Sequence, residues 1–432
     1  MSTRCVAMLL AGAGFVPALV AAQDAPLAIR GARVVTVSGP VIEKGTVVVQ
    51  QGRIVAVGPD VAVPPGATVV DGSGKTLYPG LVDALTTIGL VEVAAVPATL
   101  DSTEVGDMNP HARAWVALHP DSELIPVPRA NGVTTVLSAP LGGLVSGQSA
   151  LVRLAGTTPA AMVVKAPAAL HVVYPSGRPA FDVARLFDEP ELKTLSERLK
   201  DQQNSQKKAL ERLAEVLAEA RADAAARADA TRPAPETSMA LEALARFARG
   251  EAPVVVRVDA EDEIRATVRF ASENGLTLVI AGGLEAWRCA ELLKEKDVAV
   301  LLKVLRLPAR ESDPYDAAFA NAAALQRAGV RFAIVSDDPE MSRNLPYEAA
   351  MAAAYGLPED LALRAITLSP AEIFGVSDVV GSITPGREAN LVLATGDILD
   401  TRTQVTHVFI GGVAQSLETR HTRLYERYKD RP

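Results

Sequence analysis

The histidines are the first residues to consider, because imidazole is the most common protein ligand for catalytic metals. The chain has five, at positions 111, 119, 171, 407 and 421. His111 and His119 lie in a polar segment, and neither has a second histidine at the spacing of a metal-binding pair. His171 lies near a predicted strand and has no histidine partner either. The histidines therefore define no zinc site, and surface positions are the favoured interpretation for His111 and His119.

Two other segments carry groups that could bind a ligand. Asp101, Glu104 and Asp107 could bind a hard cation such as calcium, but their spacing matches no standard calcium loop and favours a solvated acidic loop. Residues 140–149 contain three glycines that would let backbone amides approach a ligand. This segment lacks the Gly-Lys-Ser/Thr of a phosphate-binding loop, and a flexible connection is the alternative.

The N-terminus is typical of a secretory signal peptide over residues 1–22. Arg4 precedes an apolar stretch, and small residues end it at Ala22. We expect export to the periplasm or outside the cell; a retained membrane anchor is the disfavoured alternative, because glycine and proline interrupt the apolar stretch. Cleavage would remove Cys5 and leave one cysteine, Cys289. Cys289 lies in a helical pattern and is predicted to be a buried small hydrophobic residue.

Composition limits the classes of partner. The chain has 432 residues, 49% of them hydrophobic, and a net charge of −8 from 43 basic and 51 acidic residues. This length can bury a sizeable core, either in two or three domains or in one barrel with an attached domain. The acidic balance argues against nucleic acid and against an anionic membrane surface as partners, since both attract basic proteins.

The pattern of strands and helices predicts a parallel α/β barrel between two β-rich ends. Residues 27–77 read as short strands with turns, and strands recur at 389–393 and 405–410. Between them strand and helix patterns alternate, as in a barrel. The third and fourth barrel strands are ambiguous among 150–154, 161–165 and 170–173. The pattern of residues 191–230 predicts a surface helix or helical hairpin. A solvated insertion is favoured over a partner-binding helix.

Two motifs carry a resemblance to a known family. Residues 79–89 (PGLVDALTTIG) and 381–392 (GSITPGREANLV) resemble the first barrel strand and the C-terminal motif of the amidohydrolase superfamily, in particular imidazolonepropionase-like amidohydrolases. The resemblance implies an α/β fold with a TIM-like (β/α)8 barrel and a small β-sandwich domain built from both chain ends. The implied division is a signal peptide at 1–22, a composite β domain at 26–78 plus 376–415, a barrel at 79–375 with a helical insertion at about 185–248, and a tail at 416–432.

The same resemblance indicates a changed metal site. In the family, zinc or another divalent metal is held by two histidines of strand one, whose positions here carry Leu85 and Thr87. Strand five has Arg257 and Asp259 at the possible histidine positions, and strand six ends at Gly282, which has no side chain. Leucine has no donor atom and threonine is a poor zinc ligand, so we predict no metal site of the family type.

The resemblance also supplies candidate catalytic residues. Asp337 stands where the family has the strand-eight aspartate that holds the attacking water, and Lys165 is the only candidate for a strand-four lysine. We hypothesise that Arg257 pairs with Asp337 and takes the place of the metal's charge; the alternative is that Arg257 only neutralises a buried aspartate. Thr87, Asp259, Lys165 and Gly282 are the predicted substrate-binding residues.

Two functions follow as expectations. The first is an exported hydrolase of C–N bonds in cyclic amides or peptide-like substrates, with Asp337 as general base and Arg257 stabilising the oxyanion. The alternative is an inactive homologue that binds a small molecule at the barrel mouth. A scaffold that acts through its helical insertion has less support. We expect a small-molecule substrate or ligand, no nucleic acid and no membrane after signal cleavage, and the resemblance allows a homo-oligomer.

Overall fold

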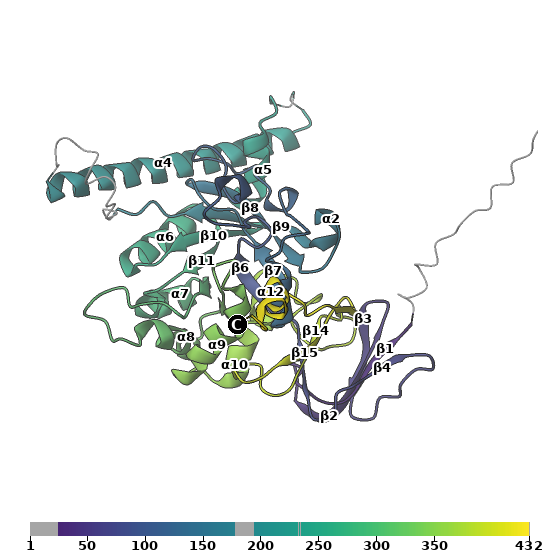
Figure 1. The fold of residues 1–432 in the computed structure, drawn as a ribbon. Helices are drawn as coiled ribbons and strands as arrows, with labels where there is room; N and C mark the ends of the chain where they lie inside the picture. Colours follow the sequence, from purple (N-terminus) through teal and green to yellow (C-terminus); the bar gives the residue numbers. More distant parts are fainter. Residues whose placement is uncertain (1–24, 178–193, 232, 234, 432) are drawn as a thin grey trace, which may run out of the picture.

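The computed structural model describes residues 25–431 apart from 178–193, 232 and 234, so the predicted signal peptide lies outside the described residues. It contains two eight-stranded sheets, one rolled into a nearly closed barrel and one formed by strands from both chain ends (Figure 1). The predicted fold class, a TIM-like barrel with a β domain from both ends, is confirmed. The barrel strands are β6 (Leu81–Thr86), β7 (Val133–Ser138), β8 (Val145–Arg153), β9 (Val163–Val173), β10 (Pro253–Val258), β11 (Thr277–Gly282), β12 (Ala299–Leu302) and β13 (Phe332–Ile334).

The barrel departs from eight parallel strands at β8. This strand is antiparallel to both β7 and β9, whereas the other neighbouring strands are parallel. The link between β7 and β8 spans only 139–144, too short for the crossover that parallel strands need. Gly142 and Gly143 have φ of 82° and 65° and allow the chain to reverse there. Half of the segment 140–149, for which a ligand loop and a flexible connection were the alternatives, is therefore part of strand β8.

The second sheet joins the chain ends. Its strands are β1 (Leu27–Val34), β2 (Ile42–Gln50), β3 (Arg53–Gly58), β4 (Thr68–Asp71), β5 (Thr76–Pro79), β14 (Leu391–Ala394), β15 (Val405–Ile410) and β16 (Val413–Gln415). β14 pairs with β5, so the C-terminal strands extend the N-terminal sheet. β5 leads almost directly into β6, and this fixes the start of the barrel beside the sheet.

Helices cover the barrel. They are α1 (Pro126–Ala130), α2 (Pro159–Met162), α4 (Leu195–Ala228), α5 (Met239–Ala248), α6 (Glu261–Glu273), α7 (Ala290–Glu295), α8 (Ala317–Ala328), α9 (Leu345–Ala354), α10 (Glu359–Ala365), α11 (Leu368–Ile373) and α12 (Arg420–Tyr428). The predicted helical insertion contains α4, a single long helix that packs against α5 (Figure 1). A capping box between Thr194 and Glu197 starts it. No helix within the described residues is both long and apolar enough for a membrane span.

Candidate functional site

Arg257 and Asp337 meet at the end of the barrel where the parallel strands finish. Arg257 lies near the end of β10 and Asp337 follows β13. The two Nη atoms of Arg257 donate to the two carboxylate oxygens of Asp337 at 2.6 and 2.8 Å. Burial lowers the pKa of the guanidinium, but hydrogen bonds and attraction from Asp337 outweigh that effect and the pKa of Arg257 is raised. The sequence-predicted pair is thus brought together, and Arg257 stays cationic.

A buried carboxyl group fixes the segment that carries Asp337. Asp83 of β6 is fully buried and accepts hydrogen bonds from the backbone N of Ser336 at 3.1 Å, from the Ser336 hydroxyl, and from the Ser342 hydroxyl at 2.7 Å. Burial raises the pKa of Asp83 to about 6, although these hydrogen bonds oppose the rise. The next residue, Asp337, has φ of 54° and donates its backbone N–H to the Leu85 carbonyl at 3.0 Å. These contacts hold Asp337 across the junction of β6 and β13.

The ion pair lies in a cavity of about 700 Å³, here called the mouth pocket. Its lining is largely apolar and includes Leu85, Thr87, Leu141, Arg257, Asp337 and Glu340. Thr87, one of the predicted substrate-binding residues, is buried and lines this pocket. The geometry therefore offers a largely apolar chamber with the Arg257–Asp337 ion pair in its wall and two further carboxylates, Asp338 and Glu340, in its lining.

Asp259 and Gly282 lie beside the pocket and serve a neighbouring contact. The Asp259 carboxylate accepts hydrogen bonds from both Nη atoms of Arg306, at 2.7 and 2.8 Å. Gly282 has φ of 95°, and a Cβ atom there would lie 2.6 Å from the Asp259 carboxylate. Gly282 thus leaves space for Asp259 to reach Arg306. The structure does not place Asp259 in the Arg257–Asp337 pair.

The prediction that Lys165 joins the site is wrong. Lys165 lies near the start of β9, while Val173 at its end is the residue level with Arg257. Eight residues of strand separate Lys165 from that end, about 26 Å at 3.3 Å per residue. Its Nζ donates to the Phe374 carbonyl at 2.7 Å, at the opposite end of the barrel. The sequence pattern did not reveal the length of β9. Lys165 was therefore predicted at the wrong end of the strand.

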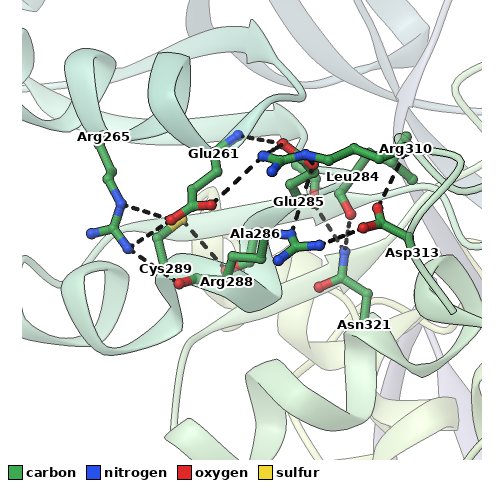
Figure 2. Close-up of polar contacts among 11 residues, drawn as sticks. Glu261, Arg265, Leu284, Glu285, Ala286, Arg288, Cys289, Arg310, Asp313 and Asn321 are labelled. Carbon is green, nitrogen blue, oxygen red and sulfur yellow. Dashed lines mark hydrogen bonds and ion pairs between the residues drawn. The ribbon is translucent and has the colours of Figure 1, made fainter.

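A network of ion pairs ties the 303–316 connection between β12 and α8 to the neighbouring strand ends (Figure 2). Arg310 bonds the fully buried Glu285 at 3.0 Å, and Asp313 pairs with Arg288. Glu285 also accepts from the backbone N of Glu261 at 2.8 Å. Together with the Arg306–Asp259 contact, this network fixes one rim of the barrel end.

The other candidate groups do not form a site. The acidic segment 101–107 contacts the β7–β8 link through backbone bonds, including one from Leu141 N to the Ser102 carbonyl at 2.7 Å. Asp101 lies 3.5 Å from His119. Cys289 is buried as predicted, and burial raises the pKa of its thiol to about 11, so it is no nucleophile at neutral pH.

The residues at the mouth do not fit the family's metal. Leu85 and Gly282 offer no side-chain donor atom, and the Asp337 carboxylate already binds a permanent cation that would repel a metal ion. Across the described part of the chain, no group of three or more His, Cys, Asp or Glu residues is placed to hold a metal.

Comparisons with known proteins identify the class. The model of the amidohydrolase family matches residues 165–414, more than half of the chain, so the protein belongs to this family. An amidohydrolase from Thermotoga maritima MSB8 is similar in structure, with a TM-score of 0.79 and 26% identity over 90% of this chain and 99% of that one.

Two curated relatives match over short stretches. An adenine deaminase of Rubrobacter xylanophilus is 38% identical over 81 residues, which cover 18% of this chain and 13% of the relative. The amidohydrolase tasK of Hapsidospora irregularis is 35% identical over 82 residues, 19% of this chain and 8% of the relative. The chain thus spans only a small part of the length of these two proteins.

Sequence reasoning missed three residues that shape the site: Asp83, Arg306 and Glu285. Asp83 had a visible signal, since it is the one acidic residue inside the apolar run 81–85. The sequence signal for Glu285 was weaker: it is an acidic residue between apolar residues after β11. Arg306 lies in a connection without periodic pattern, and nothing in the sequence assigns its partner.

Proposed function

We propose that this amidohydrolase-family protein binds a small molecule in the mouth pocket without a resident metal ion. The observation that carries the proposal is the two-pronged bond from Arg257 to both oxygens of Asp337. A metal-dependent hydrolase needs an aspartate at this place to share its oxygens with the metal or the attacking water. Here both oxygens bind a guanidinium, whose positive charge opposes a metal cation at the same carboxylate.

The pocket suits a ligand with an apolar body and an uncharged carbonyl oxygen, because its lining has three carboxylates against the single cation of Arg257. Its volume of about 700 Å³ lies in the range of small-molecule sites. Leu85, Val91 and Leu100 supply apolar surface. Guanidinium has five N–H donors, of which two bind Asp337, so the others can donate to a ligand oxygen. Cyclic amides and peptide-like molecules meet this description.

Metal-free hydrolysis is the second candidate, favoured by the presence of a carboxylate and a guanidinium in the same pocket wall. In this reaction Asp337 takes a proton from water while the water oxygen attacks the amide carbon. Arg257 stabilises the oxyanion, the C–N bond breaks, and the proton passes from Asp337 to the leaving nitrogen. Each Asp337 oxygen keeps a second lone pair for water, but the residues at the mouth do not fit the family's metal that would activate this water, which makes binding the better-supported function.

The test measures binding and turnover together. Chelator-treated protein is mixed with hydantoin, pyrrolidinone or glycylproline; calorimetry records binding and mass spectrometry records product. We expect binding without product, weakened by Arg257→Met and unchanged in the exposed control Arg331→Met. Product that disappears in Asp337→Asn would instead establish the hydrolase, and binding that is indifferent to Arg257→Met would contradict the proposed pocket.

Export is part of the proposal. Its support is the charged, then apolar, then small-residue order of residues 1–22. Mass spectrometry of the protein recovered from the producing cell should find Gln23 at the N-terminus. Recovery of the chain with Met1 retained would contradict cleavage.

A further inference from the structure

His171 is a histidine of the barrel interior that the proposed function does not yet use. Backbone pairing sets His171 of β9 opposite Val255 of β10, and Val173 opposite Arg257. Side chains two residues apart on a strand share a face. Leu170 and Val172 line an apolar space beneath α4, on the outer face. His171 therefore faces inward, one layer below Arg257.

A small cavity, here called the lower cavity, lies between these two side chains. Its lining includes His171, Arg257, Ser146, Val255 and Ala281. It shares Arg257, Leu141 and Val173 with the mouth pocket, so it adjoins the floor of that pocket. Its free space admits about one water-sized group.

The His171 ring enters this cavity with an unsatisfied polar atom. The residue is only 6% exposed, and within the described residues its Nε2 atom has no hydrogen-bond partner. Burial, and then the charge of Arg257, lower the pKa of His171 to about 3, so the ring is neutral at physiological pH. A neutral imidazole has one N–H donor and one acceptor nitrogen. A buried polar atom without a partner destabilises the fold, unless a ligand or water completes it.

We infer that His171 and Arg257 form a subsite for one uncharged hydroxyl group of the ligand bound in the mouth pocket; this rests on the proposed function. The hydroxyl oxygen accepts from an outer N–H of Arg257, and its hydrogen is donated to the imidazole. The lower cavity admits a single small group, which excludes a carboxylate or phosphate. His171 is thus a specificity-determining residue beneath the ion pair.

The test compares pyrrolidinone with its 4-hydroxy derivative, two compounds that differ by a single hydroxyl. Wild-type protein should bind the hydroxylated compound about tenfold more tightly, the effect of one well-made hydrogen bond in a buried site. His171→Leu keeps an apolar side chain of similar size in the wall and should bind both compounds equally. The matched control is His407→Leu, which replaces a histidine of the terminal sheet. This variant should keep the wild-type difference in affinity between the two compounds.

Thermal unfolding separates specificity from a structural role. Because Nε2 has no bond to lose, His171→Leu should melt at the wild-type temperature or higher. A clear drop in melting temperature, with equal weakening for both compounds, would show that the ring is structural and overturn the subsite. Equal binding of both compounds by wild type would overturn the subsite but not the proposed binding in the mouth pocket. No binding of either compound would overturn the proposed function and the subsite with it.

Discussion

The energy of the Arg257–Asp337 pair can be measured with a double-mutant cycle. The two changes are Arg257→Met, which keeps most of the alkyl chain, and Asp337→Asn, which keeps the carboxylate shape without its charge. Asparagine also tolerates the left-handed backbone of position 337, where φ is 54°. The cycle therefore removes the charges with little other disturbance.

The exposure of the two side chains sets the expected magnitude. Removing one partner of a fully buried pair costs about 3–5 kcal/mol, whereas an exposed pair contributes about 0–1 kcal/mol. The Arg257 and Asp337 side chains are 34% and 21% exposed, between these limits. Each single change should lower the unfolding free energy by about 2 kcal/mol. The double change should cost little more than either one, so the coupling energy is about 2 kcal/mol.

Urea unfolding followed by circular dichroism measures the four free energies. The chain supplies its own control in Arg331 and Asp297, a pair at 3.0 Å whose side chains are 49% and 77% exposed. Its coupling should be about 0.5 kcal/mol or less. A coupling energy for Arg257 and Asp337 that is no larger than this control would show that the pair is not a fixed element of the pocket wall.

Two further variants test the surroundings of the pair. Burial raises the pKa of Asp83 from its usual 3.8 to about 6 in the fold, so its stabilising contribution is complete below about pH 4 and is lost as the pH rises through about 6. The advantage of wild type over Asp83→Asn in urea unfolding should therefore shrink by about 3 kcal/mol from pH 4 to pH 7.5, and a constant difference would refute this. Gly282→Ala should cost about 2 kcal/mol or more, since φ is 95° and the new Cβ meets Asp259; Gly275→Ala, with φ of 64° and open space, should cost about 1 kcal/mol. Equal costs for the two glycines would contradict the close contact.

The barrel and its mouth were predictable because they depend on local pattern. Alternating strands and helices define the barrel, and the resemblance at 79–89 and 381–392 locates its first strand and the returning sheet. Arg257 and Asp337 each stand at the end of a short strand, so the geometry of a parallel barrel brings them to one edge. The sequence therefore predicted their meeting correctly.

The remaining features depend on lengths and partners that no local pattern encodes. Lys165 was misplaced because β9 begins earlier than its apolar core suggests and pairs with the antiparallel β8. The inward direction of His171 follows from strand register, which one residue of shift would reverse. Arg306 reaches Asp259 across a connection whose path is set by tertiary contacts.

Zinc binding at the mouth pocket shows most directly whether the ion pair stands in place of the metal. Protein incubated with excess zinc and then passed through a desalting column should retain far less than one zinc ion per chain by mass spectrometry, because Arg257 occupies the Asp337 carboxylate. The comparison is Arg257→His, which supplies an imidazole and frees the Asp337 carboxylate. Its zinc content after the same treatment measures the metal affinity that this change adds. One zinc ion per wild-type chain, lost in Asp337→Asn, would contradict the claim that an internal ion pair stands in place of the metal.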